Sequence, residues 1–111
     1  PIKIKYAIKR YTDEVNRLYG VMNKQLKKNE FLAGRYSIAD MACWGWIIPW
    51  KNQGQKISDF PHLKRWFEQV GQRPAVIKGF AAGKEMRKQL LSENTKEAKK
   101  AKSILFNQRS R

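Results

Sequence analysis

The sequence has one cysteine, Cys43, and one histidine, His62, in 111 residues. An internal disulfide is therefore excluded. A metal centre or a Cys–His catalytic site built from this chain alone is not expected, and neither is a covalently bound cofactor. Because proteins without disulfides are typical of reducing compartments, the sequence predicts a cytoplasmic protein.

Long apolar runs are also missing. The longest one, from Met41 to Trp50, contains Gly45 and Pro49, whereas a bilayer-spanning helix needs about 20 apolar residues. No association with a membrane is therefore predicted. The N-terminus has no initiator Met and no apolar signal segment, and helical patterning follows soon after it. We expect the chain to begin in the middle of a fold.

Acidic residues are scarce, with 9 against 24 basic ones and a net charge of +15. The excess is spread out: +5 in residues 1–30, +4 in 31–83 and +6 in 84–111. This spread argues against sequence-specific DNA recognition, but nonspecific, salt-sensitive binding to nucleic acid is expected. A solvated basic surface is the simpler interpretation.

Apolar spacing predicts an all-α fold, because no segment alternates between apolar and polar residues. A first helix is expected over 12–28, capped by Thr12, and it carries an apolar stripe predicted to be buried: Val15, Leu18, Tyr19, Met22 and Leu26. A second, over 38–52, is apolar on nearly every side and is expected at the centre of a bundle. Pro49 should kink or end it.

Two further helices are predicted to begin at prolines. Pro61 suits the first turn of a helix whose buried face is Leu63, Trp66, Phe67 and Val70. Pro74 opens a short helix through about Phe80. Residues 84–111 form a basic tail, interpreted as helical or disordered.

The strongest local signal is Ser37-Ile38-Ala39-Asp40. Ser37 is placed as an N-cap, and the Asp40 carboxylate can accept a hydrogen bond from the Ser37 backbone N–H, which makes a capping box. This spacing accounts for Asp40 as a structural residue and not as a catalyst. No catalytic residue is assigned in the chain.

Three segments together resemble the C-terminal helical domain of glutathione S-transferases, in order and in spacing. They are Phe31-Leu32-Ala33-Gly34 with Tyr36-Ser37-Ile38-Ala39-Asp40, Phe60-Pro61-His62-Leu63-Lys64-Arg65-Trp66, and Arg73-Pro74-Ala75-Val76. Residues 6–11 and 17–20 resemble the bacterial nu-class branch, whose members are glutathione transferases and glutathione-dependent disulfide reductases. The resemblance covers roughly residues 3–82. It predicts a helical domain over 1–83, incomplete at its N-terminal end, followed by the tail at 84–111.

The resemblance implies that a thioredoxin-like domain outside this chain carries the residues that activate the glutathione thiol. The chain alone is then expected to be inactive. Its partner should be that domain or a second copy of itself, and its substrate glutathione. One glutathione-binding residue of the nu-class branch falls on Arg10, whose guanidinium can bind a carboxylate through two hydrogen bonds. A solvated charge near a helix start is the alternative for Arg10.

The apolar helix holds Cys43 and the tryptophans Trp44, Trp46 and Trp50. Cys43 is interpreted as a buried small apolar residue, since an apolar helix without nearby cations keeps a thiol unreactive. The tryptophans are interpreted as core residues, although the resemblance allows Trp44 and Trp46 to border a pocket for the acceptor substrate. His62 is expected at the surface.

Two other functions remain open from the sequence. The first is a non-enzymatic interaction module of glutathione-transferase-like fold, which a defined partner surviving high salt would support. The second is a small basic helical protein associated with nucleic acid, which would have to bind specifically at physiological salt.

Overall fold

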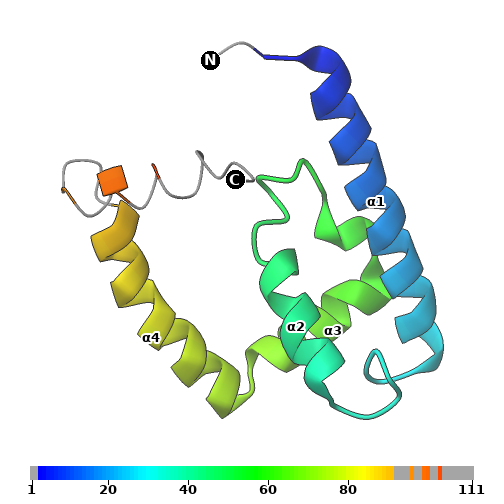
Figure 1. The fold of residues 1–111 in the computed structure, drawn as a ribbon. Helices are drawn as coiled ribbons and strands as arrows, with labels where there is room; N and C mark the ends of the chain where they lie inside the picture. The colour runs from blue at the N-terminus through cyan, green and yellow to red at the C-terminus, as the bar shows by residue number, and fades with distance from the viewer. Residues whose placement is uncertain (1–2, 92–95, 97–98, 101–102, 104–111) are drawn as a thin grey trace, which may run out of the picture. The chain divides into compact units, whose positions relative to one another are not determined.

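The computed structural model of the chain describes residues 3–91 together with positions 96, 99, 100 and 103. Its helices are α1 (Lys5–Lys28), α2 (Ile38–Ile47), α3 (Pro61–Gly71) and α4 (Pro74–Leu91), with a short 3-10 helix, η1 (Ile57–Asp59), before α3 (Figure 1). The described residues contain isolated bridges within 31–35 and no strand, so the predicted all-α class is confirmed. The chain divides into two compact units, Pro1–Arg73 and Pro74–Arg111.

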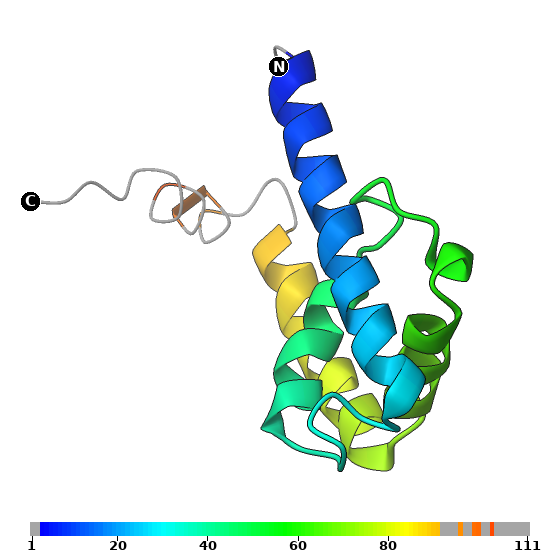
Figure 2. The ribbon, with the colours of Figure 1, turned by 90° about the vertical axis from the view of Figure 1, so that its right-hand side faces the viewer.

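Helix α3 is the centre of the first unit. Leu63, Trp66 and Val70 on its buried face are fully inaccessible to solvent, and both α1 and α2 pack against it (Figure 2). Pro61 occupies its first turn, as predicted. Phe67, predicted on the same face, is half-buried.

Helix α1 begins at Lys5, so the predicted start at Thr12 is wrong. Residues 5–11 contain neither Gly nor Pro, and Ile8 and Tyr11 continue the helical apolar spacing toward the N-terminus. The predicted burial of the whole stripe is wrong as well. Tyr19 and Leu26 are buried, but Leu18 is 46% exposed because α3 covers only one side of α1.

Helix α2 ends at Ile47, five residues earlier than predicted, and residues 48–54 form turns. Pro49 ends the helix as expected, because it has no N–H for a further helical hydrogen bond. The prediction that this apolar helix lies at the centre of a bundle is wrong, because the described part of the chain leaves much of its surface uncovered. Ile38 and Trp46 are 81% and 75% exposed, while Asp40 and Ile47 are buried.

The ends of α1 and α3 are tied together by side chains. Asn23 of α1 accepts hydrogen bonds through Oδ1 from the backbone N–H groups of His62 (2.9 Å) and Leu63 (3.0 Å). These groups start α3, whose own N-cap residue provides no side-chain cap. In return, Arg65 of α3 donates to the carbonyl oxygens of Leu26 (3.0 Å), Asn29 (3.1 Å) and Glu30 (3.2 Å) at the C-terminal end of α1. A side chain of each helix therefore forms hydrogen bonds with backbone groups at one end of the other helix, where these groups lack a partner within their own helix.

The second unit contains α4, which runs from Pro74 to Leu91. The prediction of a short helix ending near Phe80 is wrong, since no proline interrupts the pattern beyond Pro74. Most of the predicted tail from residue 92 onward lies outside the described residues, and a domain boundary at 83 stays a prediction. No helix within the described positions is long and apolar enough to cross a bilayer.

Candidate functional site

The Asp40 carboxylate is fully buried at the start of α2 and makes hydrogen bonds on both oxygens. Oδ2 accepts from the backbone N–H of Ser37 (2.9 Å), which completes the predicted capping box. Oδ1 accepts from the indole N–H of Trp66 (2.7 Å) and from the backbone N–H of Leu32 (3.0 Å). Asp40 therefore joins α2, α3 and the preceding loop.

Electrostatics support a structural role for this carboxylate. Burial by itself would raise the pKa of Asp40, but the N–H donors, above all those of Leu32 and Trp66, bring it below its ordinary value. A carboxylate held ionised by fixed donors is a poor general acid or base at neutral pH.

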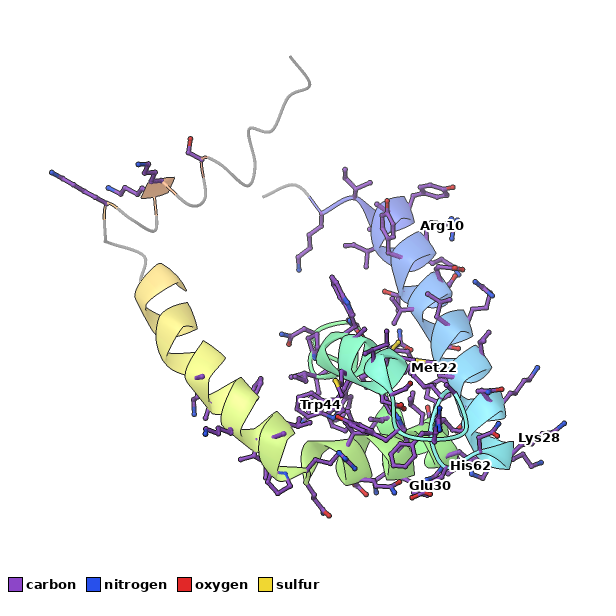
Figure 3. The ribbon with its side chains drawn as sticks, turned by 60° about the horizontal axis from the view of Figure 1, so that its bottom comes forward. Arg10, Met22, Lys28, Glu30, Trp44 and His62 are labelled. Carbon is purple, nitrogen blue, oxygen red and sulfur yellow. The ribbon has the colours of Figure 1, made fainter. Side chains whose placement is uncertain are left out.

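A pocket of about 270 Å³ opens between α1 and α2 and is the best candidate for a ligand site in the first unit. Its wall is almost entirely apolar. The lining residues are Val15, Leu18, Tyr19, Met22, Cys43, Trp46, Ile47 and Gln53. In Figure 3, Met22 lies on the side of α1 that faces α2. The volume is close to the lower bound for ligand pockets, about 300 Å³, and suits a small apolar group.

Tyr19 and Gln53 provide polar atoms at the pocket. The Tyr19 hydroxyl donates to Oε1 of Gln53 at 2.6 Å, and burial raises the pKa of Tyr19 to about 12. The phenol is therefore protonated at neutral pH and serves as a donor. Gln53 lies in the turn after α2, and nothing in the local sequence indicates that this turn reaches α1.

The structure separates the three candidate residues of α2. Cys43 and Trp46 both line the pocket, and Cys43 is half-buried where full burial was predicted. Trp44 lies on the other side of the helix, stacked on Phe67 with ring centroids 5.6 Å apart and with its indole N–H donating to the Phe67 carbonyl at 2.9 Å. A hydrogen-bonded Trp44 positions α2 on α3.

Arg10, the residue on which the resemblance places a glutathione contact, lies in the second turn of α1. It is on the outside of α1, away from the pocket (Figure 3). Its Nη1 is 4.0 Å from Oε2 of Glu14, at the limit of an ion pair, and the side chain is 60% exposed. Glu14 is instead engaged by Arg17, which donates to both carboxylate oxygens at 2.9 and 2.8 Å. The hydrogen bond from Arg17 also lowers the pKa of Glu14.

His62, expected at the surface, is half-buried at the start of α3. Across the described positions, no three His, Cys, Asp or Glu side chains lie close enough to hold a metal ion.

Residues 4–74 match the family model described as "Glutathione S-transferase, C-terminal domain". Among curated proteins, the chain is 46% identical over 77 residues to "Disulfide-bond oxidoreductase YfcG" of Escherichia coli (strain K12), covering 68% of this chain and 36% of that protein. It is 42% identical over 87 residues to "Disulfide-bond oxidoreductase YghU" of the same organism, and this match covers 71% of this chain and 30% of that protein. A "Glutathione S-transferase-like protein tpcF" from Aspergillus fumigatus is 34% identical over 97 residues, and this match covers 71% of this chain and 41% of that protein. The chain thus spans about a third of the length of these relatives.

Proposed function

Since the chain belongs to the glutathione S-transferase family through its C-terminal helical domain, we propose that it is the helical part of a protein that uses glutathione to reduce disulfides. Transfer of glutathione to an electrophile is the related reaction that the same site would serve. The names of the two Escherichia coli relatives support disulfide chemistry. The two roles proposed for this chain are binding glutathione through Arg10 and lining the site of the second substrate.

The geometry of Arg10 is the observation that carries the proposal. Two arginines flank Glu14 on α1, and Arg17 already binds both oxygens of its carboxylate. Arg10 is 4.0 Å from that carboxylate and 60% exposed, so its guanidinium keeps donors available for a second carboxylate. Glutathione carries two carboxylates, and the planar guanidinium can bind one of them through two N–H groups.

The apolar pocket beside Trp46 is the proposed border of the site for the second substrate. Because Arg10 lies on another face of α1 (Figure 3) and does not line this pocket, this role is proposed independently of the glutathione contact. Its walls carry one thiol, one phenol and one amide among apolar groups. Such a surface favours the apolar part of a disulfide or electrophile and offers no charge to it. Activation of the glutathione thiol is assigned to the remainder of a longer protein, as the resemblance implies, so the chain alone should lack reductase activity.

A calorimetric titration of the full chain with glutathione tests the role of Arg10. Salt near 0.15 M limits the Debye length to about 8 Å, so general attraction by the basic surface is screened. We expect saturable binding that Arg10→Ala weakens by about tenfold or more, which corresponds to the loss of about 1.4 kcal/mol or more.

Lys24→Ala is the matched control, because Lys24 is an exposed cation of the same helix and its removal leaves intact the Arg17–Glu14 pair beside Arg10. Its removal should leave glutathione binding within about twofold of the unchanged chain, a difference of about 0.4 kcal/mol. Equal losses in the two variants would show that only surface charge was at work. If millimolar glutathione gives no saturable binding, the proposed role of Arg10 is refuted.

A further inference from the structure

Charged side chains of α1 form a cluster around Arg10, which we call the α1 charge cluster. Its members are Lys9, Arg10, Asp13, Glu14 and Arg17. Side chains three and four positions apart on a helix are neighbours, so both carboxylates of the cluster lie within reach of Arg10. The cations of the cluster outnumber its carboxylates by one, which leaves one cation without a full partner.

Each carboxylate of the cluster is bound to a cation other than Arg10. Lys9 donates to Oδ2 of Asp13, and Arg17 donates to both oxygens of Glu14, at 2.9 and 2.8 Å. Nη1 of Arg10 is 4.0 Å from Oε2 of Glu14, beyond hydrogen-bond distance. The surplus positive charge of the cluster therefore lies on Arg10.

The order of the residues along the helix explains why Glu14 pairs with Arg17. A carboxylate pairs better with a cation that follows it along a helix than with one that precedes it. Arg17 follows Glu14 by three positions, whereas Arg10 precedes it by four. The hydrogen bond from Arg17 also lowers the pKa of Glu14, so this carboxylate is ionised at neutral pH. Without Arg17, its remaining neighbour of opposite charge in the cluster would be Arg10.

We propose that Arg17 is a positioning residue for glutathione binding, because by occupying both oxygens of Glu14 it keeps this carboxylate off the guanidinium of Arg10. The inference rests on the proposed role of Arg10 in binding a carboxylate of glutathione. It adds a residue that acts on the ligand only through a competing anion.

Two physical effects would weaken glutathione binding if Glu14 lost Arg17. A free Glu14 competes for the donors of Arg10, and the apparent affinity falls with the fraction of Arg10 that it captures. It also repels a carboxylate bound to the same guanidinium, since like charges about 4 Å apart in water repel by about 1 kcal/mol, a factor of about five in affinity. Direct attraction by Arg17 is weaker, because Arg17 lies about 10 Å along the axis from Arg10, beyond the Debye length of about 8 Å at 0.15 M salt.

A double-mutant cycle of Arg17→Ala and Glu14→Gln tests the proposal, with the affinity of the full chain for glutathione measured by calorimetry at 0.15 M salt. Arg17→Ala should weaken binding about fivefold. Glu14→Gln should change it by less than about twofold, because Arg17 already occupies the carboxylate. In the double variant no competing carboxylate is left, and the affinity should return to within about twofold of that of Glu14→Gln alone.

Arg17→Lys is the conservative control, because an ammonium group can still pair with Glu14. It should keep the affinity within about twofold of the unchanged chain. A purely structural role of the Arg17–Glu14 pair predicts a different pattern, in which Glu14→Gln weakens binding as much as Arg17→Ala does.

Three results would overturn the proposal: that structural pattern, an Arg17→Ala chain with unchanged affinity, and an equal loss on Arg17→Ala with and without Glu14. The last would show that Arg17 acts by its charge alone. Arg10→Ala separates this inference from the proposed function. Binding that survives Arg10→Ala refutes the role of Arg10 itself, whereas binding that Arg10→Ala weakens, together with an additive cycle, refutes only the role of Arg17.

Discussion

Replacing Asp40 by Ala should destabilise the protein far more than the loss of an ordinary helix cap. The substitution removes the acceptor for the Ser37 N–H, which costs about 1 kcal/mol. It also leaves the Trp66 indole N–H and the Leu32 N–H without their acceptor beside a fully buried position, at about 1–3 kcal/mol each. The expected total is about 4 kcal/mol, a large part of the roughly 5–15 kcal/mol that stabilises a typical domain.

Thermal and urea unfolding measure this loss directly. A decrease of about 4 kcal/mol corresponds to a fall in melting temperature of about 15–30 °C for a unit of this size. Ser37→Ala is the matched control, because it removes the capping hydroxyl and leaves the buried carboxylate with its other donors; it should cost about 1 kcal/mol.

A double-mutant cycle with Trp66→Phe isolates the indole contact. In the Trp66→Phe background there is no indole N–H to leave unpaired, so Asp40→Ala should cost about 1–3 kcal/mol less there than in the unchanged chain. Two results would refute this account. One is a loss of stability in Asp40→Ala no larger than in Ser37→Ala, and the other is a cycle without coupling between Asp40 and Trp66. Either would mean that the hydrogen bonds of Asp40 to Trp66 and Leu32 do not stabilise the fold.

The pH dependence of stability follows from the lowered pKa of Asp40. A pKa that is lower in the folded chain means that the unfolded chain binds more protons near pH 4, so stability is fully present above the ordinary value of about 4 and falls as pH drops below it. Asp40→Asn cannot titrate. The stability difference between the unchanged chain and this variant should shrink between about pH 5 and pH 3.

Two further predictions concern helix ends and glycines. Asn23→Ala should cost about 1–2 kcal/mol by removing the acceptor at the start of α3, whereas Asn23→Asp should keep most of it, because a carboxylate suits a helix N-terminus; urea unfolding that ranks Asp below Ala would contradict this. Gly34→Ala should destabilise by about 1–2 kcal/mol, because Gly34 has a φ of +85° in otherwise open space. Gly20→Ala, in the interior of α1 with nothing within 4 Å of the added methyl, should instead stabilise by about 1 kcal/mol, and equal signs for the two in thermal melts would refute the backbone argument.

The elements predicted correctly from the sequence are those encoded by short-range interactions. The capping box spans four residues, and the buried face of α3 follows from apolar spacing after Pro61. The sequence also encodes the early start of α1, since Ile8 and Tyr11 continue the apolar spacing of the helix toward its N-terminus, and Thr12 lies inside the helix and does not cap it. Serine and threonine also occur inside helices, so a capping residue alone does not define a helix start.

The exposure of α2 could not be predicted from its composition. An apolar helix is expected to be covered on all sides, but how many sides are covered depends on neighbours that the helix does not encode. Trp44 and Trp46 lie two residues apart and so project from nearly opposite faces of α2. The sequence cannot tell which of them meets α3 and which lines the pocket. The contact of Gln53 with Tyr19 is hidden for a similar reason, because it joins residues far apart in the chain.

The exchange of end contacts between α1 and α3 has a consequence for how this unit opens. Asn23 completes the start of α3 only while α1 is helical, and Arg65 covers the carbonyl groups that end α1 only while α3 is in place. Fraying of either helix therefore exposes polar backbone groups of both. The two helices then form a single cooperative opening unit, whose amide hydrogens exchange with solvent together and not helix by helix.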